Sequence, residues 1–73
     1  MSPYELMAEH HPGELAPNRR RWHVVRRGRV TGLCGLLLSP VGETGPLVAW
    51  ADLAQSGRCL ACWRAYRGRA TAA

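Results

Sequence analysis

The sequence predicts a small α+β fold in which a β-hairpin precedes a C-terminal helix. The chain has 73 residues, which is enough for one small domain. Two stretches rich in β-branched and apolar residues, 21–27 and 30–38, are separated by Gly28, as expected for a hairpin. Residues 62–69 combine helix-forming residues with aromatic side chains at helical spacing, and Gly68 offers a possible end for that helix.

The N-terminal residues give no sustained structural period. Residues 1–18 combine a short apolar stretch around Leu6 with several Pro and Gly residues, which favours neither a helix nor a strand. We therefore expect a flexible or loosely docked arm over residues 1–18, a folded module over residues 19–69 and a disordered tail over residues 70–73.

The turn of the hairpin determines which residues face each other. A two-residue type II′ turn needs Gly at its first central position, which Gly28 supplies. Counting outward from that turn, Val25 faces Gly32. The same register places His23 opposite Cys34, with Cβ atoms about 4.5 to 5.5 Å apart, a separation that suits two ligands of one metal ion. A turn one residue earlier makes Cys34 a diagonal neighbour instead, so the sequence favours the first register without fixing it.

The segment between the hairpin and the helix lacks a regular pattern. Residues 39–47 carry four Gly or Pro positions and indicate an exposed loop. Residues 48–55 are compatible with a short helix or an irregular segment, and residues 56–58 interrupt it before Cys59.

A chain of this size needs a crosslink or a bound ion to stay folded. Ordering about 50 residues at roughly 1.5 kcal/mol each nearly cancels what so small a core provides. Three cysteines cannot all pair within one monomer, and no signal peptide is recognisable at the start. We therefore expect a metal ion rather than disulfides, and a reducing cytoplasm. The apolar run at residues 36–38 is far too short to span a membrane.

The cysteines and one histidine form a pattern that suits zinc. Cys59 and Cys62 form a CxxC pair, whose tight turn directs two thiolates at one ion. Zn²⁺ prefers four sulfur or nitrogen ligands, and His23 and Cys34, neighbours across the predicted hairpin, complete the set. The expected cofactor is one Zn²⁺ per chain, and a hairpin followed by a helix that opens on a CxxC pair is a treble-clef or zinc-ribbon type of arrangement. The predicted ligands are His23, Cys34, Cys59 and Cys62.

Other interpretations of these residues stay open. Cys34 alone is compatible with a buried free thiol, and His10 or His11 can replace His23 as the fourth ligand. A redox CxxC pair would normally lie in a βαβ context that this chain lacks. An iron–sulfur cluster normally requires four cysteines.

The same residues carry a resemblance. The segments Trp22-His23-Val24-Val25, Leu33-Cys34-Gly35 and 57–63 are similar to the wH…CG…CxxC layout of short, mostly uncharacterised actinobacterial zinc-finger proteins. The similarity covers residues 22–66. It implies that His23, Cys34, Cys59 and Cys62 are ligands and that Gly35 is the flanking glycine, but it implies no activity.

The charge distribution favours an anionic partner. The formal net charge is +5, and the basic residues crowd into residues 19–29 after an acidic beginning. Such a cluster is typical of a surface for nucleic acid or an acidic protein, although arginine is also a common solubilising residue. Trp22, flanked by arginines, is the best candidate for an exposed aromatic that stacks on bases. The candidate nucleic-acid-binding residues are Arg19, Arg20, Arg21, Trp22, Arg26, Arg27 and Arg29.

Enzymatic activity is not expected. The chain offers one Asp, no nucleophile with a base, and a metal site whose four positions are all filled by protein, which is typical of a structural site. If His23 were not a ligand, an open position would remain. The sequence therefore predicts a regulatory or nucleic-acid-binding module. The alternative is an accessory or adaptor protein that binds a partner protein or a second copy through an apolar patch at residues 36–38 and 48–50.

Overall fold

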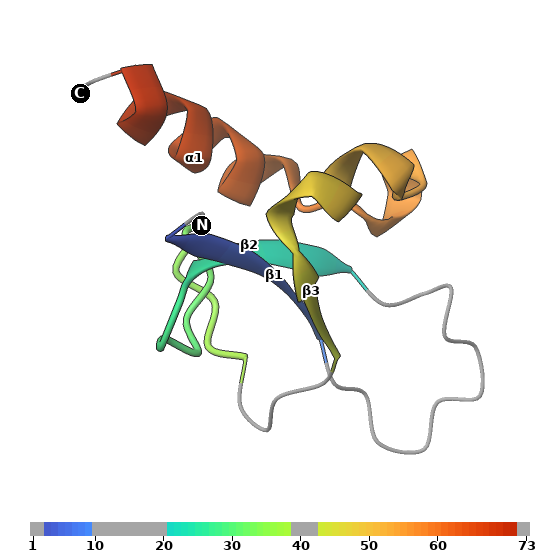
Figure 1. The fold of residues 1–73 in the computed structure, drawn as a ribbon, viewed down its shortest axis with the longest axis horizontal. Helices are drawn as coiled ribbons and strands as arrows, with labels where there is room; N and C mark the ends of the chain where they lie inside the picture. The colour runs from blue at the N-terminus through green and yellow to red at the C-terminus, as the bar shows by residue number, and fades with distance from the viewer. Residues whose placement is uncertain (1–2, 10–20, 39–42, 72–73) are drawn as a thin grey trace.

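A three-stranded antiparallel sheet and a C-terminal helix form the fold (Figure 1). The computed structural model describes residues 3–9, 21–38 and 43–71. The strands lie in the order β2-β1-β3, and two 3₁₀ helices connect β3 to the helix. The α+β class with a C-terminal helix is confirmed. The elements are β1 (Tyr4–Ala8), β2 (Trp22–Arg26), β3 (Thr44–Pro46), η2 (Leu47–Asp52), η3 (Gln55–Gly57) and α1 (Leu60–Thr71).

The first strand corrects the expectation of a loosely docked arm. β1 is the central strand, with Leu6 opposite Val24 of β2 on one side and Gly45 of β3 on the other. A central strand is covered on both faces, so its apolar residues follow one another instead of alternating. Leu6, Met7 and Ala8 are accordingly all buried. Residues 10–18 of the expected arm lie outside the described residues.

The predicted exposed loop at residues 39–47 contains a strand that was not expected. β3 pairs with β1 on the side away from β2. Proline has no N–H to donate, and within sheets it is therefore confined to edge strands and similar positions. Pro46 lies in such an edge strand, which reconciles a turn-like composition with strand pairing. Residues 39–42 lie outside the described part of the chain.

The predicted second strand of the hairpin is a looped segment instead. The backbone N–H of Arg29 donates to the carbonyl of Arg26 at 2.9 Å, so the turn closes one residue earlier than predicted, with Gly28 at φ 86°. After the turn the chain departs from regular pairing with β2, but Val25 still bridges Gly32, as the favoured register requires. Beyond Gly32 the chain folds back on itself through a bridge between residues 31 and 37 rather than continuing along β2.

The sheet separates two small apolar cores. Figure 1 shows α1 and η2 on one face of the sheet and residues 27–38 on the other. The larger core, under the helices, contains Leu6, Val24, Trp50, Cys59 and Cys62. The smaller core contains Met7, Val25 and Leu38. The two faces are therefore covered by different parts of the chain, and both meet at β2.

The C-terminal helix is longer than predicted at both ends. α1 begins at Leu60, within the CxxC pair, and continues past Gly68 to Thr71. Ala70 and Thr71 thus belong to the helix instead of the predicted disordered tail. At twelve residues, α1 is well below the roughly 20 residues needed to cross a bilayer, and no helix in the described ranges is long and apolar enough to do so.

Candidate metal centre

The site lies along the edge of β2 that faces away from β1. Two carbonyl groups of β2 accept bonds there from other segments: Trp22 from the N–H of Cys59 at 3.0 Å, and Val24 from the N–H of Leu33 at 2.9 Å. The residue between these two carbonyls is His23. Segments 32–34 and 58–59 are thus fastened to β2 on either side of the histidine.

A tight loop presents the second ligand. The N–H of Gly35 donates to the carbonyl of Gly32, and the N–H of Gly32 donates to the carbonyl of Leu36, both at 2.9 Å. Gly35 has a φ of 97°, a backbone conformation that glycine adopts without steric cost. The resemblance implies Gly35 as the glycine that flanks Cys34, and it lies in this loop. It directs the thiol of Cys34 at the His23 ring.

The first turn of α1 presents the remaining two ligands. Cys59 precedes the helix and Cys62 lies in its first turn, where the N–H of Trp63 donates to the carbonyl of Cys59 at 3.2 Å. Residues three positions apart lie on the same side of a helical turn. Both sulfur atoms therefore face β2.

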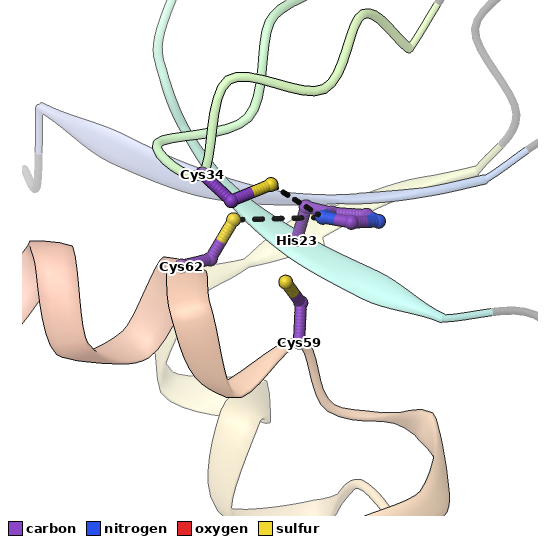
Figure 2. Close-up of side chains that lie close together, drawn as sticks. All are labelled: His23, Cys34, Cys59 and Cys62. Carbon is purple, nitrogen blue, oxygen red and sulfur yellow. Dashed lines mark hydrogen bonds between the residues drawn. The ribbon is translucent and has the colours of Figure 1, made fainter.

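The four predicted ligands come together in the structure. Figure 2 shows the side chains of His23, Cys34, Cys59 and Cys62 directed toward a common point. Their ligand atoms all lie within 4.8 Å of one another. The Nδ1 atom of His23 is 3.5 Å from the sulfur atoms of both Cys34 and Cys62. In a tetrahedral zinc site, bond lengths of about 2.3 Å to sulfur and 2.05 Å to nitrogen place these atoms about 3.6 Å apart. The cluster therefore has the dimensions of a metal site.

Burial shapes the protonation of the ligands. Burial raises the pKa of the Cys62 thiol from 9.0 to about 12, because a lone thiolate is poorly solvated there. Burial also lowers the pKa of His23 below 6.5, while Glu9 partly opposes this shift. The histidine is therefore neutral near pH 7, as metal ligation requires. The thiolates need a cation to become stable, and a divalent metal ion supplies that charge.

A residue that the sequence analysis did not single out lies behind the histidine. The Nε2 atom of His23 is buried with no hydrogen-bond partner, and a carboxylate oxygen of Glu9 lies 3.5 Å from it. Glu9 directly follows β1, and its N–H donates to the carbonyl of Arg21 at 3.0 Å. A carboxylate in this position fixes which histidine nitrogen faces the metal. This role of Glu9 is not predictable from the sequence, because Glu9 falls within the residues expected to form a loosely docked arm.

A glycine provides the space that the cluster needs. A Cβ atom at Gly32 would lie 3.2 Å from the sulfur of Cys62 and 3.4 Å from that of Cys34. The first distance is tighter than most contacts made by real Cβ atoms, and the second is at the limit of ordinary van der Waals contact. Gly32, expected only as the partner of Val25 in the hairpin, thus also belongs to the surroundings of the metal site.

The predicted nucleic-acid-binding residues that the structure describes lie at both ends of β2. Arg21 precedes β2, whereas Arg26, Arg27 and Arg29 lie at its other end, about 17 Å away for five extended residues. All four are exposed, and Arg27 lies 3.8 Å from the Glu5 carboxylate. Arg19 and Arg20 are outside the described residues, as are the alternative ligands His10 and His11.

The tryptophans belong mainly to the core. Trp22 was expected to be the exposed aromatic, but it is half-buried and packs against the larger core. The rings of Trp50 and Trp63 stack with centroids 4.8 Å apart, and Trp63 also contacts Tyr66 at 5.3 Å. The arginines rather than Trp22 therefore remain as candidates for contacting an external partner.

Comparisons with known proteins identify no relative of this chain. No protein-family model, curated protein or solved structure matches the chain. The similarity to short actinobacterial zinc-finger proteins therefore stays a prediction. The fold and the cluster themselves define a small α+β module with three cysteines and one histidine arranged to hold a metal ion.

Proposed function

We infer that this protein is a zinc-stabilised module that binds nucleic acid. The observation that carries the proposal is the convergence of four ligand atoms within 4.8 Å from three segments of the chain. Three thiolates and an imidazole form a soft, tetrahedral ligand set, which is typical of Zn²⁺. The ligands lie in a strand, a tight loop and a helix, so a bound ion ties together the parts that cover β2.

A structural role for the ion is favoured over a catalytic one. Catalytic zinc sites normally have three protein ligands and keep one position for water or substrate. Here the protein offers four donors, and three of them are buried: His23, Cys59 and Cys62. The ion would thus contribute folding free energy instead of reacting with a substrate.

The basic surface supports nucleic acid as the partner. The net charge of +5 attracts a polyanion, and arginine donates paired hydrogen bonds that match phosphate oxygens. Arg26 at the end of β2 and Arg29 on the following segment, which also carries Cys34, are both exposed. A metal-fixed loop would hold these side chains in place without the large core that other small domains need.

Exposed leucines favour a second candidate, a protein-binding adaptor. Leu36 and Leu37 are 47% and 62% exposed, and Val30 on the same segment is 39% exposed. The predicted patch is smaller than expected, because Leu38 and Trp50 are buried. Apolar side chains on one loop can dock a partner protein or a second copy.

Two measurements test the proposal. Native mass spectrometry of the chain, purified without added metal, should show one zinc ion per chain. Binding of the zinc-loaded chain to single- and double-stranded oligonucleotides should then fall steeply between about 50 and 200 mM salt. If zinc is bound but no nucleic acid binds at about 50 mM salt, the adaptor function replaces nucleic-acid binding. If zinc is absent from the folded chain, the structural-zinc proposal is wrong.

A further inference from the structure

A pocket of about 290 Å³ lies beside the metal cluster, because Gly32 lines it and also approaches the sulfur atoms of Cys34 and Cys62. Its walls come from the turn after β2, the loop that carries Cys34 and the last turn of α1. Arg26 contributes from the end of β2, Arg29 from the residues after the turn, and Arg69 from the helix. The remaining lining consists of Thr31 and residues 32, 33 and 35.

The three arginines bring like charges together. No carboxylate lines the pocket, and none of the ion pairs found between described residues involves Arg26, Arg29 or Arg69. Other arginines have structural contacts: Arg58 donates to the carbonyl of Ala51 at 3.1 Å and lies over the Trp50 ring. Three arginines lining one pocket make it positively charged, and a bound anion would offset the repulsion between like charges.

Side chains rather than the backbone would make the contacts. The N–H groups of Gly32, Leu33 and Gly35 already donate to carbonyls within the protein. Arginine side chains and the Thr31 hydroxyl are the remaining donors, and several guanidinium groups require an anion with several acceptor oxygens. The C-terminal end of α1 carries a partial charge of about −0.5. Three full positive charges outweigh it.

We propose that this pocket binds a phosphate group, supplied by the backbone of a nucleic acid. The proposal rests on the inferred nucleic-acid function and deepens it by locating one phosphate contact. It adds Arg69, which is 40 residues from Arg29 in the sequence and was not among the predicted binding residues. It also removes Trp22 and Arg27, which do not line the pocket, from this particular contact.

The pocket is coupled to the metal cluster through the loop they share. Gly32 lines the pocket and also lies against the sulfur atoms of Cys34 and Cys62. The loop is held on β2 by the ligand Cys34 and by the bridge between Val25 and Gly32. Removal of the metal should therefore displace the pocket wall, so phosphate binding should require the metal.

The test is a nuclear magnetic resonance titration of the isotope-labelled, zinc-loaded full chain at about 50 mM salt. Inorganic phosphate, a mononucleotide and a short single-stranded oligonucleotide serve as probes. Each should shift the amide signals of Thr31, Gly35 and Arg69. Arg26→Gln and Arg69→Gln should each weaken oligonucleotide binding roughly tenfold, as expected for a charged hydrogen bond. Arg64→Gln is the matched control, because Arg64 is exposed on α1 and does not line the pocket.

The possible results separate the pocket from the general function. If Arg64→Gln weakens oligonucleotide binding as strongly as Arg26→Gln and Arg69→Gln do, the pocket is not the binding site. Nucleic-acid binding as the general function then still stands. If phosphate and the mononucleotide shift the amide signals at the pocket but the oligonucleotide does not bind, the pocket is a phosphate site. The proposal that a nucleic acid supplies the phosphate is then wrong. Absence of any shift with all three probes overturns the phosphate site. A zinc count by native mass spectrometry for every variant shows whether the fold is intact.

Discussion

The metal cluster and the aromatic cluster hold the same helix to the sheet by different means. At the metal cluster, Cys62 of α1 lies 3.5 Å from His23 of β2. In the aromatic cluster, defined here as Tyr4, Trp50, Trp63 and Tyr66, ring centroids of successive partners lie 4.8 to 5.3 Å apart. Cys62 and Trp63 are adjacent in sequence, so one of two neighbouring helix residues is available for metal coordination and the other packs in the aromatic cluster.

The difference lies in how each cluster tolerates change. Packing contributes roughly in proportion to the apolar area buried, so an aromatic cluster that loses one ring keeps the rest of its contacts. A structural tetrahedral site takes all four ligands from the protein, and loss of one ligand lowers the affinity of the whole site for the ion. Metal coordination suits small loops, because one bound ion would join residues up to 39 positions apart in sequence.

The largest expected effect is that of removing the metal. Structural zinc contributes about 10 to 16 kcal/mol in comparable small sites, more than a core of this size supplies. A strong chelator should therefore unfold the chain, including the aromatic cluster. Circular dichroism and tryptophan fluorescence measure this. A folded spectrum after proven metal loss would show that the aromatic cluster is sufficient.

Adjacent substitutions in α1 should have clearly different consequences. Cys62→Ser removes a buried ligand and should abolish stoichiometric zinc binding. Trp63→Ala should lower the free energy of unfolding by no more than about 3 kcal/mol, the lower end for a large buried aromatic, because Trp63 is only half-buried. Its zinc content should remain one ion per chain. Mass spectrometry with thermal unfolding of both variants tests this, and zinc loss in Trp63→Ala would contradict it.

The convergence of the four candidate ligands was predictable because metal-site chemistry limits the choices. A CxxC pair, one further cysteine and a histidine at the matching hairpin register leave few ways to complete a tetrahedral site. The register calculation held for Val25 and Gly32, even though the turn differed. The two-residue turn closes between Arg26 and Arg29 instead of Arg27 and Val30, and the chain then departs from regular pairing before it reaches Gly32.

The sheet was harder to predict because its central strand depends on distant partners. The apolar run from Leu6 to Ala8 resembles a fragment of a helix as much as a strand, and only pairing with β2 and β3 decides between them. Pro46 argued for a loop because an edge strand cannot be recognised before its neighbours are known. Glu9 was overlooked for the same reason, since its role depends on where β1 ends.

A glycine at the metal site provides the next test. Gly32→Ala would place a methyl group against two metal-binding sulfur atoms and should weaken zinc binding by about 1 to 3 kcal/mol, as overpacking does. Gly68→Ala is the matched control: nothing lies near its Cβ position, and alanine in a helix is favoured by about 0.5 to 1 kcal/mol. Competition with a metal-binding dye gives the affinities. Equal zinc affinity in both variants would contradict the close packing at Gly32.

The smallest expected effect concerns the carboxylate behind the histidine. Glu9→Gln should lower zinc affinity about tenfold, the weak end of the range for residues that orient a metal ligand, because the Glu9 side chain is 19% exposed. Glu5→Gln is the matched control, since Glu5 approaches Arg27 instead. Imidazole nitrogen shifts measured by nuclear magnetic resonance should show Nδ1 of His23 bound to metal and Nε2 protonated. Glu9→Gln should alter the Nε2–H signal, whereas a purely structural role for Glu9 would leave it unchanged. Metal binding through Nε2, or equal zinc affinity in the two variants, would show that the carboxylate does not orient the ring.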